Sequence, residues 1–62
     1  MSVSNGDRVR VSASFPADKA RINNIHVGDC GTVYFVALGK IALVKWDKGH
    51  TTSANVFDLE RM

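Results

Sequence analysis

The stretch Val27–Gly49, VGDCGTVYFVALGKIALVKWDKG, contains two apolar runs bounded by glycines. The first run covers Thr32–Leu38, the second covers Ile41–Trp46, and only Gly39-Lys40 separates them. Two β-rich runs joined by a short glycine-containing connection predict a β-hairpin. Because both runs carry apolar residues on both faces, we expect a small barrel, or a sheet whose outer face meets another chain.

Alternation within the hairpin predicts which side chains are buried, because successive residues of a strand point to opposite faces. We therefore expect Val33 and Phe35 to share the inner face, while Tyr34 and Val36 share the outer one. Trp46 is also expected inside, because its large apolar ring contributes most when it is buried. The full predicted core consists of Val9, Val11, Val33, Phe35, Val44, Trp46 and Leu59.

The remaining elements surround this hairpin. A first strand is predicted over Asp7–Ser12, where valines alternate with arginines, and a long loop follows over Ala13–His26. Pro16 precedes one predicted helical turn, and Phe15, Ile22 and Ile25 are expected to pin the loop to the core. After the hairpin we expect a polar strand over His50–Ala54, a helical turn over Asn55–Asp58 and a closing strand over Leu59–Met62. Gly31 and Gly49 are predicted to need positive φ.

The predicted fold class is thus all-β, with five short strands in one domain over residues 6–62 and a flexible N-terminus over residues 1–5. A chain of 62 residues has no room for a second domain. Cys30 is the only cysteine, which rules out an internal disulfide and fits a reducing compartment. The N-terminus lacks the features of a signal peptide, and no apolar stretch has membrane-spanning length. We therefore expect a cytoplasmic protein with no membrane contact.

The order of elements resembles the SH3-like small β-barrel. Four segments carry the resemblance and together span almost the whole chain: Gly6–Val11, Gly28–Val33, Val44–Gly49 and Asp58–Glu60. The pattern is similar to KOW and Tudor-type modules and to small bacterial and phage domains with the skeleton GDRV…GTV…VKWD.G…LE. The resemblance implies a five-stranded barrel and a bacterial or phage origin. Such barrels bind RNA, DNA, peptides or other subunits, and the fold alone does not select among them.

The chain is also similar, near both ends, to the type II plasmid-borne dihydrofolate reductases. Their GDRVR opening matches Gly6–Arg10, and their ALER ending matches Leu59-Glu60-Arg61. A Val-Gln-Ile-Tyr stretch lines the active pore of those enzymes, whereas the corresponding positions here are Thr51–Ala54. Without the glutamine and tyrosine, the activity is not expected. Small accessory chains of photosystem I and of ferredoxin-thioredoxin reductase are similar at the same level, and they use this barrel as a docking piece.

Catalysis is not predicted. A nucleophile needs a neighbouring base, and Cys30 lies in a turn with His26 four residues away. His26 and His50 are separated by the whole hairpin without a carboxylate cluster, so no metal site is expected. The six acidic residues are dispersed and form no recognisable acid–base pair. We therefore expect a non-catalytic protein without a cofactor.

Binding is the predicted role, with two hypotheses for the partner. A tyrosine among cations can stack a base while a cation contacts phosphate. The first hypothesis is therefore an accessory or regulatory protein that docks on nucleic acid, or on a complex that handles it, through Arg8, Arg10, Tyr34 and Lys45, extended by Lys19 and Arg21. The net charge of +2 permits this role but is only mildly basic. The alternative is that these are ordinary solvent-facing residues.

The second hypothesis is a protein-interaction or assembly subunit, which includes self-association. The apolar residues predicted to point outward near the hairpin turn are Val36, Leu38, Ile41 and Leu43. An exposed apolar cluster of this kind is typical of a protein interface. The alternative here is that barrel curvature and the long loop cover it.

Overall fold

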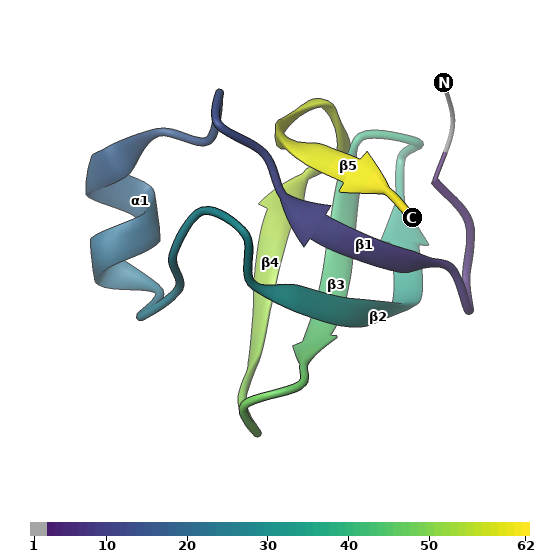
Figure 1. The fold of residues 1–62 in the computed structure, drawn as a ribbon. Coiled ribbons are helices and arrows are strands. Elements are labelled where there is room, and N and C mark those ends of the chain that lie inside the picture. Colours follow the sequence, from purple (N-terminus) through teal and green to yellow (C-terminus); the bar gives the residue numbers. More distant parts are fainter. Residues whose placement is uncertain (1–2) are drawn as a thin grey trace.

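The computed structural model describes residues 3–62 and shows one antiparallel sheet of five strands, in the order β4-β3-β2-β1-β5 (Figure 1). The expected flexible segment over residues 1–5 lies partly outside the described residues. The elements are β1 (Arg8–Val11), α1 (Ala17–Ile22), β2 (Cys30–Ala37), β3 (Ile41–Trp46), β4 (Thr51–Asn55), the 3-10 turn η1 (Val56–Asp58) and β5 (Leu59–Arg61). The predictions of mostly β structure, a long first loop and a helical turn before the last strand are confirmed. Within residues 3–62 the sheet is open between its edge strands β4 and β5.

The sheet folds over a single core. In Figure 1, β1 and β5 run across the direction of β3 and β4, and β2 is long enough to pair with both β1 and β3. Alternating residues of β1 and β3 point inward, which gives buried Val9, Val11, Val44 and Trp46 as predicted. Trp46 is 1% exposed, and its indole Nε1 donates a 2.7 Å hydrogen bond to Oγ1 of Thr52.

A β-bulge in β2 changes the predicted alternation. The register with β3 shifts between Val33, which pairs with Val44, and Phe35, which pairs with Leu43. Tyr34 is the extra residue, and an extra residue reverses the inward and outward phase of the strand beyond it. The prediction that Phe35 lies in the core is therefore wrong, because its side chain is 49% exposed. Val36, predicted to point outward, packs against the core instead.

The hairpin turn also differs from the prediction by one residue. Its positive-φ residues are Leu38 (56°) and Gly39 (65°), and the amide of Lys40 donates a 3.0 Å hydrogen bond to the carbonyl oxygen of Ala37. Two consecutive positive φ values match the twist of antiparallel strands, which is why such turns are common in hairpins. The turn is therefore centred on Leu38-Gly39 rather than Gly39-Lys40.

The long loop is held by two of the three predicted anchors. Phe15 and Ile25 are buried, whereas Ile22 is 80% exposed, so its predicted role as an anchor is wrong. The short helix α1 instead buries Ala20. Asn23 ends α1, and its carbonyl oxygen lies 2.8 Å from Nε2 of His50 in the turn between β3 and β4.

The two glycines singled out from the sequence have different roles. Gly49 has a φ of 112°, as predicted. Gly31 does not adopt positive φ, and that prediction is wrong. A Cβ on Gly31 would lie 2.7 Å from the carbonyl oxygen of Lys45 and 2.7 Å from Cγ1 of Val44. The neighbouring strand β3 therefore lies too close to Gly31 to leave room for a side chain. None of the helices within residues 3–62 has the length and apolar character needed to cross a membrane.

Candidate binding surfaces

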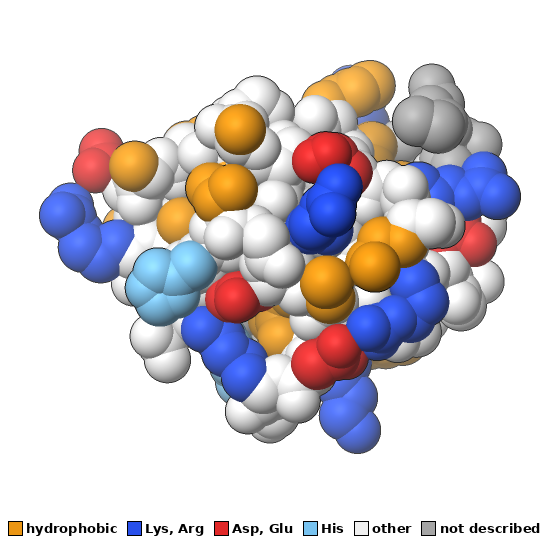
Figure 2. Space-filling model, in the orientation of Figure 1, with side chains coloured by type: hydrophobic (Ala, Val, Ile, Leu, Met, Phe, Trp, Pro, Cys, Tyr) orange, Lys and Arg blue, Asp and Glu red, His pale blue; other side chains and the backbone are white. Residues whose placement is uncertain are grey.

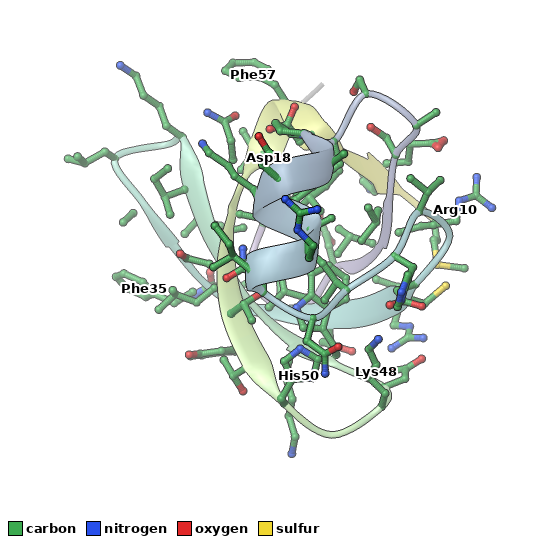
Figure 3. All side chains as sticks on the ribbon, turned by 90° about the vertical axis from the view of Figure 1, so that its left-hand side faces the viewer. Arg10, Asp18, Phe35, Lys48, His50 and Phe57 are labelled. Atoms are coloured by element: carbon green, nitrogen blue, oxygen red, sulfur yellow. The ribbon has the colours of Figure 1, made fainter. Side chains whose placement is uncertain are left out.

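The outward side of the β2–β3 hairpin carries a group of exposed apolar and aromatic side chains. We define the hairpin face by the residues Tyr34, Phe35, Leu38, Ile41, Leu43 and Lys45. Tyr34 is 50% exposed at the bulge, and Phe35 stands directly opposite Leu43 on the neighbouring strand. In Figure 3, Phe35 projects away from the sheet. The bulge therefore produces two adjacent solvent-facing aromatic rings, whereas the sequence predicted only one.

No carboxylate comes from the strands of this face. Neither residues 30–46 nor residues 51–55 include Asp or Glu, and the exposed Lys45 stands opposite Thr32 and Thr51 on the neighbouring strands. The strand registers place Thr32 opposite Lys45 on one side and opposite Arg8 on the other. Because neighbouring strands lie about 5 Å apart, Arg8 and Lys45 share one row across the sheet about 10 Å apart. The structure thus brings together three of the predicted site residues: Arg8, Tyr34 and Lys45.

Arg8 is engaged by a carboxylate. Its Nη1 donates a 2.7 Å hydrogen bond to Oδ1 of Asp47, its Nη2 donates a 2.6 Å bond to Oδ2, and Nη1 also reaches Oγ1 of Thr32 at 3.0 Å. The hydrogen bond to Asp47 raises the pKa of the Arg8 guanidinium. The same hydrogen bond lowers the pKa of the Asp47 carboxyl. A two-point pair of this kind fixes the guanidinium in place, so it is less available to a phosphate than a solitary cation.

Other predicted cations are paired as well. Arg10 lies 3.3 Å from Glu60, and Arg21 lies 3.2 Å from Asp18 on α1. Figure 2 shows blue and red side chains next to one another rather than a continuous blue stripe on the face it presents. In Figure 3, Arg10 lies on the side of the molecule opposite Phe35. Arg10 therefore does not join the hairpin face, and Arg21 lines a separate hollow beside α1.

Two further predicted residues lie at the border of the hairpin face. Lys19 on α1 lines a hollow of about 310 Å³, which Ile41 and Ser53 also line. Lys19 therefore lies beside the β4 edge of the face. Leu38 at the tip is 91% exposed. Of the four residues predicted as a protein-binding patch, Leu38 and Ile41 are exposed, Leu43 is partly exposed, and Val36 packs against the core.

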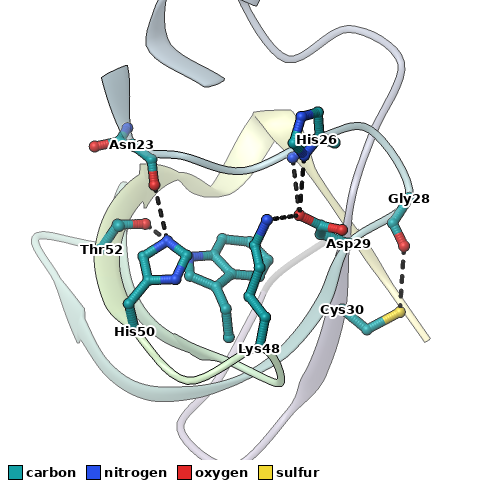
Figure 4. Close-up of polar contacts among 9 residues, drawn as sticks. Asn23, His26, Gly28, Asp29, Cys30, Lys48, His50 and Thr52 are labelled. Carbon is teal, nitrogen blue, oxygen red and sulfur yellow. Dashed lines mark hydrogen bonds and ion pairs between the residues drawn. The ribbon is translucent and has the colours of Figure 1, made fainter. Parts of the chain in front are cut away.

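A polar cluster joins the entry of β2 to the turn after β3 (Figure 4). Oδ2 of Asp29 accepts hydrogen bonds from Nζ of Lys48 and from the backbone amide of His26, each at 2.9 Å. These bonds, that of Lys48 first, lower the pKa of the Asp29 carboxyl. The thiol of Cys30 donates to the carbonyl oxygen of Gly28 at 3.5 Å. These contacts hold the entry of β2 against the turn after β3.

Among residues 3–62, no three His, Cys, Asp or Glu side chains gather in a way that would hold a metal ion. No protein-family model, curated protein or solved structure matches this chain. Within residues 3–62, the hairpin face is a group of exposed apolar side chains that neither core packing nor ion pairing explains. The alternation of the sequence did not predict that Phe35 lies on the hairpin face, because nothing in the residue types indicates a bulge at Tyr34.

Proposed function

We propose that this protein is a non-catalytic binding module on an SH3-like barrel, and that its hairpin face docks on single-stranded nucleic acid. The observation that carries this proposal is the pair of half-exposed aromatic rings, Tyr34 and Phe35, beside the exposed Lys45. The strand order, the long first loop and the 3-10 turn before β5 support the SH3-like assignment.

The chemistry of the face suits an unpaired strand better than a duplex. Bases of a single strand are free to stack on aromatic rings, and each stacked base contributes about 1–3 kcal/mol. A lysine close to the rings contacts the backbone phosphate of the same strand. The hydroxyl groups of Thr32 and Thr51, opposite Lys45 on either side, add hydrogen-bonding groups at the border of the aromatic pair.

The small number of free cations on the hairpin face limits the expected affinity for nucleic acid. Since Arg8 is held by Asp47, we expect Lys45 and at most one or two further cations to neutralise phosphates. Each contact on a single strand contributes about −0.7 to the slope of log K against log salt concentration. We therefore expect a slope of about −0.7 to −2 and micromolar affinity at low salt. Such binding is that of an accessory module rather than of a strong nucleic-acid clamp.

Fluorescence anisotropy with a labelled oligothymidine of about 15 nucleotides tests the proposal. The variants Tyr34→Ala and Phe35→Ala are each expected to weaken binding by about 5- to 150-fold. Phe57→Ala is the matched control, because Phe57 is also an exposed phenylalanine but lies in η1 outside the face. Lys45→Ala is expected to lower the salt slope by about 0.7.

Two results would contradict the proposal. One is the absence of any anisotropy change at low salt with the folded protein. The other is a loss of affinity in Phe57→Ala as large as that in Phe35→Ala. A labelled duplex of the same length serves as the comparison, and we expect it to bind more weakly because its bases are already stacked on one another.

A second candidate function is self-association through the same hairpin. The observation that favours it is Leu38, which is 91% exposed although it lies in the left-handed region that disfavours leucine. Sedimentation equilibrium over a range of protein concentrations tests this candidate. We expect a dimer that Leu38→Asn disrupts, and a monomer at every concentration would contradict the candidate.

A further inference from the structure

A second hollow lies away from the hairpin face, between α1 and the loops on either side of it. Its volume is about 480 Å³, which is within the range of small-ligand sites. Buried Phe15 and Ile25 form part of its lining, and Val27 stands exposed at its border. The face shown in Figure 2 has several hydrophobic side chains gathered over α1 and the neighbouring loop, next to a histidine.

Small side chains on the helix leave this space open. Ala17 and Ala20 are three residues apart on α1, a spacing that places them on the same face of a helix, and both line the hollow. Ala13 lines it from the preceding loop. A leucine or methionine at any of these positions would occupy part of the volume, so the room depends on three alanines.

The polar groups of the lining are cationic or neutral. Arg21 and His26 are its only side chains able to carry charge, and none of the described lining residues is Asp or Glu. Arg21 has one ion-pair partner within residues 3–62, Asp18, and both side chains are more than four-fifths exposed. An ion pair so exposed contributes little, so the guanidinium is free to turn toward a ligand at low cost.

We infer that this hollow binds a small carboxylate with an apolar body, for example an aromatic acid. The apolar body lies among Ala17, Ala20 and Phe15, and the carboxylate accepts hydrogen bonds from the Arg21 guanidinium at the rim. The site is separate from the hairpin face, so ligand binding here is tested independently of nucleic-acid binding.

A ¹⁵N NMR titration of the full chain tests this inference with two probes of similar shape. The first probe is 2-naphthylacetate, and the second is the neutral 2-naphthaleneethanol. We expect saturable shifts of the Ala20, Ile25 and Val27 amides with both, and about 3- to 10-fold tighter binding of the acid. Arg21→Gln is expected to reduce the affinity for the acid to that for the alcohol, while the affinity for the alcohol stays unchanged.

The variant Ala17→Leu fills the hollow from an exposed helix position, so the fold is expected to survive while both probes bind more weakly. Arg21→Gln likewise changes an exposed side chain and keeps the protein folded for comparison. The inference is overturned if neither probe shifts these amides, if acid and alcohol bind the parent protein equally, or if Ala17→Leu leaves both affinities unchanged. Shifts centred on the hairpin face would also overturn it.

Discussion

The indole Nε1 of Trp46 donates a 2.7 Å hydrogen bond to Oγ1 of Thr52 across the β3–β4 pair. Trp46 is the largest fully buried side chain, so its N–H would be unsatisfied without this partner. One residue therefore contributes both the centre of the apolar core and a polar link to the edge strand β4. A domain of this size has only about 3–9 kcal/mol of stability in total, so losing this contact would remove a sizeable share of it.

Replacing Trp46 with alanine is expected to cost about 3–5 kcal/mol, because it opens a large cavity in the core. Urea unfolding followed by circular dichroism measures the loss. Thr52→Val is the matched variant. It keeps the shape of the partner but leaves the buried indole N–H unpaired, at a cost of about 1–3 kcal/mol. A cooperative melt of Trp46→Ala near the parent temperature would show that the indole is not central to the core.

Gly31→Ala is expected to destabilise the protein by about 1–3 kcal/mol through overpacking. The added Cβ would meet the backbone oxygen of Lys45, which is unable to move without disturbing β3. Gly39→Ala is the comparison, because its Cβ meets nothing within 4 Å while its φ of 65° is strained for alanine. We expect about 1–2 kcal/mol there. Crystal structures of the two variants separate the causes: a displaced β3 in Gly31→Ala and an altered turn in Gly39→Ala.

Leu38→Asn is expected to stabilise the hairpin by about 0.5–1 kcal/mol, since asparagine tolerates positive φ and Asn-Gly is a preferred hairpin turn. The leucine side chain is almost fully exposed, so no core contact is lost. The thermal midpoint should rise while self-association, if the second candidate function holds, disappears. A lower midpoint would mean that Leu38 makes native contacts that offset its backbone strain.

The pKa of the Asp29 carboxyl is lowered by Lys48 and by the amide of His26. The free energy of unfolding is therefore expected to fall at acidic pH. A carboxyl whose folded-state pKa lies below its unfolded value of about 3.8 stabilises the protein above that value. This contribution is lost as the pH falls through the folded-state pKa. We expect the contribution of Asp29 to be constant from pH 7 to pH 5 and to decline below about pH 4.

Asp29→Asn is expected to lower stability at pH 7 and to flatten the acid decline, measured by urea unfolding at several pH values. Asp18→Asn is the control, because its pair with Arg21 is almost fully exposed and contributes little. Equal acid declines in the parent and in Asp29→Asn would assign the effect to another carboxyl.

Much of the strand pattern was predictable because local signals agreed with one another. Valines alternate with arginines in β1, and glycines mark both ends of the hairpin. The burial of Trp46 follows from the same alternation. Ile22 was misplaced for a physical reason: α1 is only six residues long, and the small Ala20 faces the core while the larger isoleucine faces solvent.

The candidate site was only partly predictable. Tyr34 and Lys45 were identified from their residue types, but the exposure of Phe35 depends on a one-residue register shift between β2 and β3. Such a shift is set by tertiary pairing and leaves no local mark. Arg8 is neutralised by Asp47, which lies 39 positions away in the sequence. A count of cations along β1 therefore overestimated the positive charge available for binding.

The most direct test of the hairpin face is a ¹⁵N NMR titration of the protein with oligothymidine at low salt. We predict saturable shifts of the amides of Tyr34, Phe35 and Lys45, with the β1 and β5 amides near Arg10 and Glu60 unmoved. Shifts centred on Arg10 and Glu60, or no shifts at all, would contradict the assignment of nucleic-acid binding to this face.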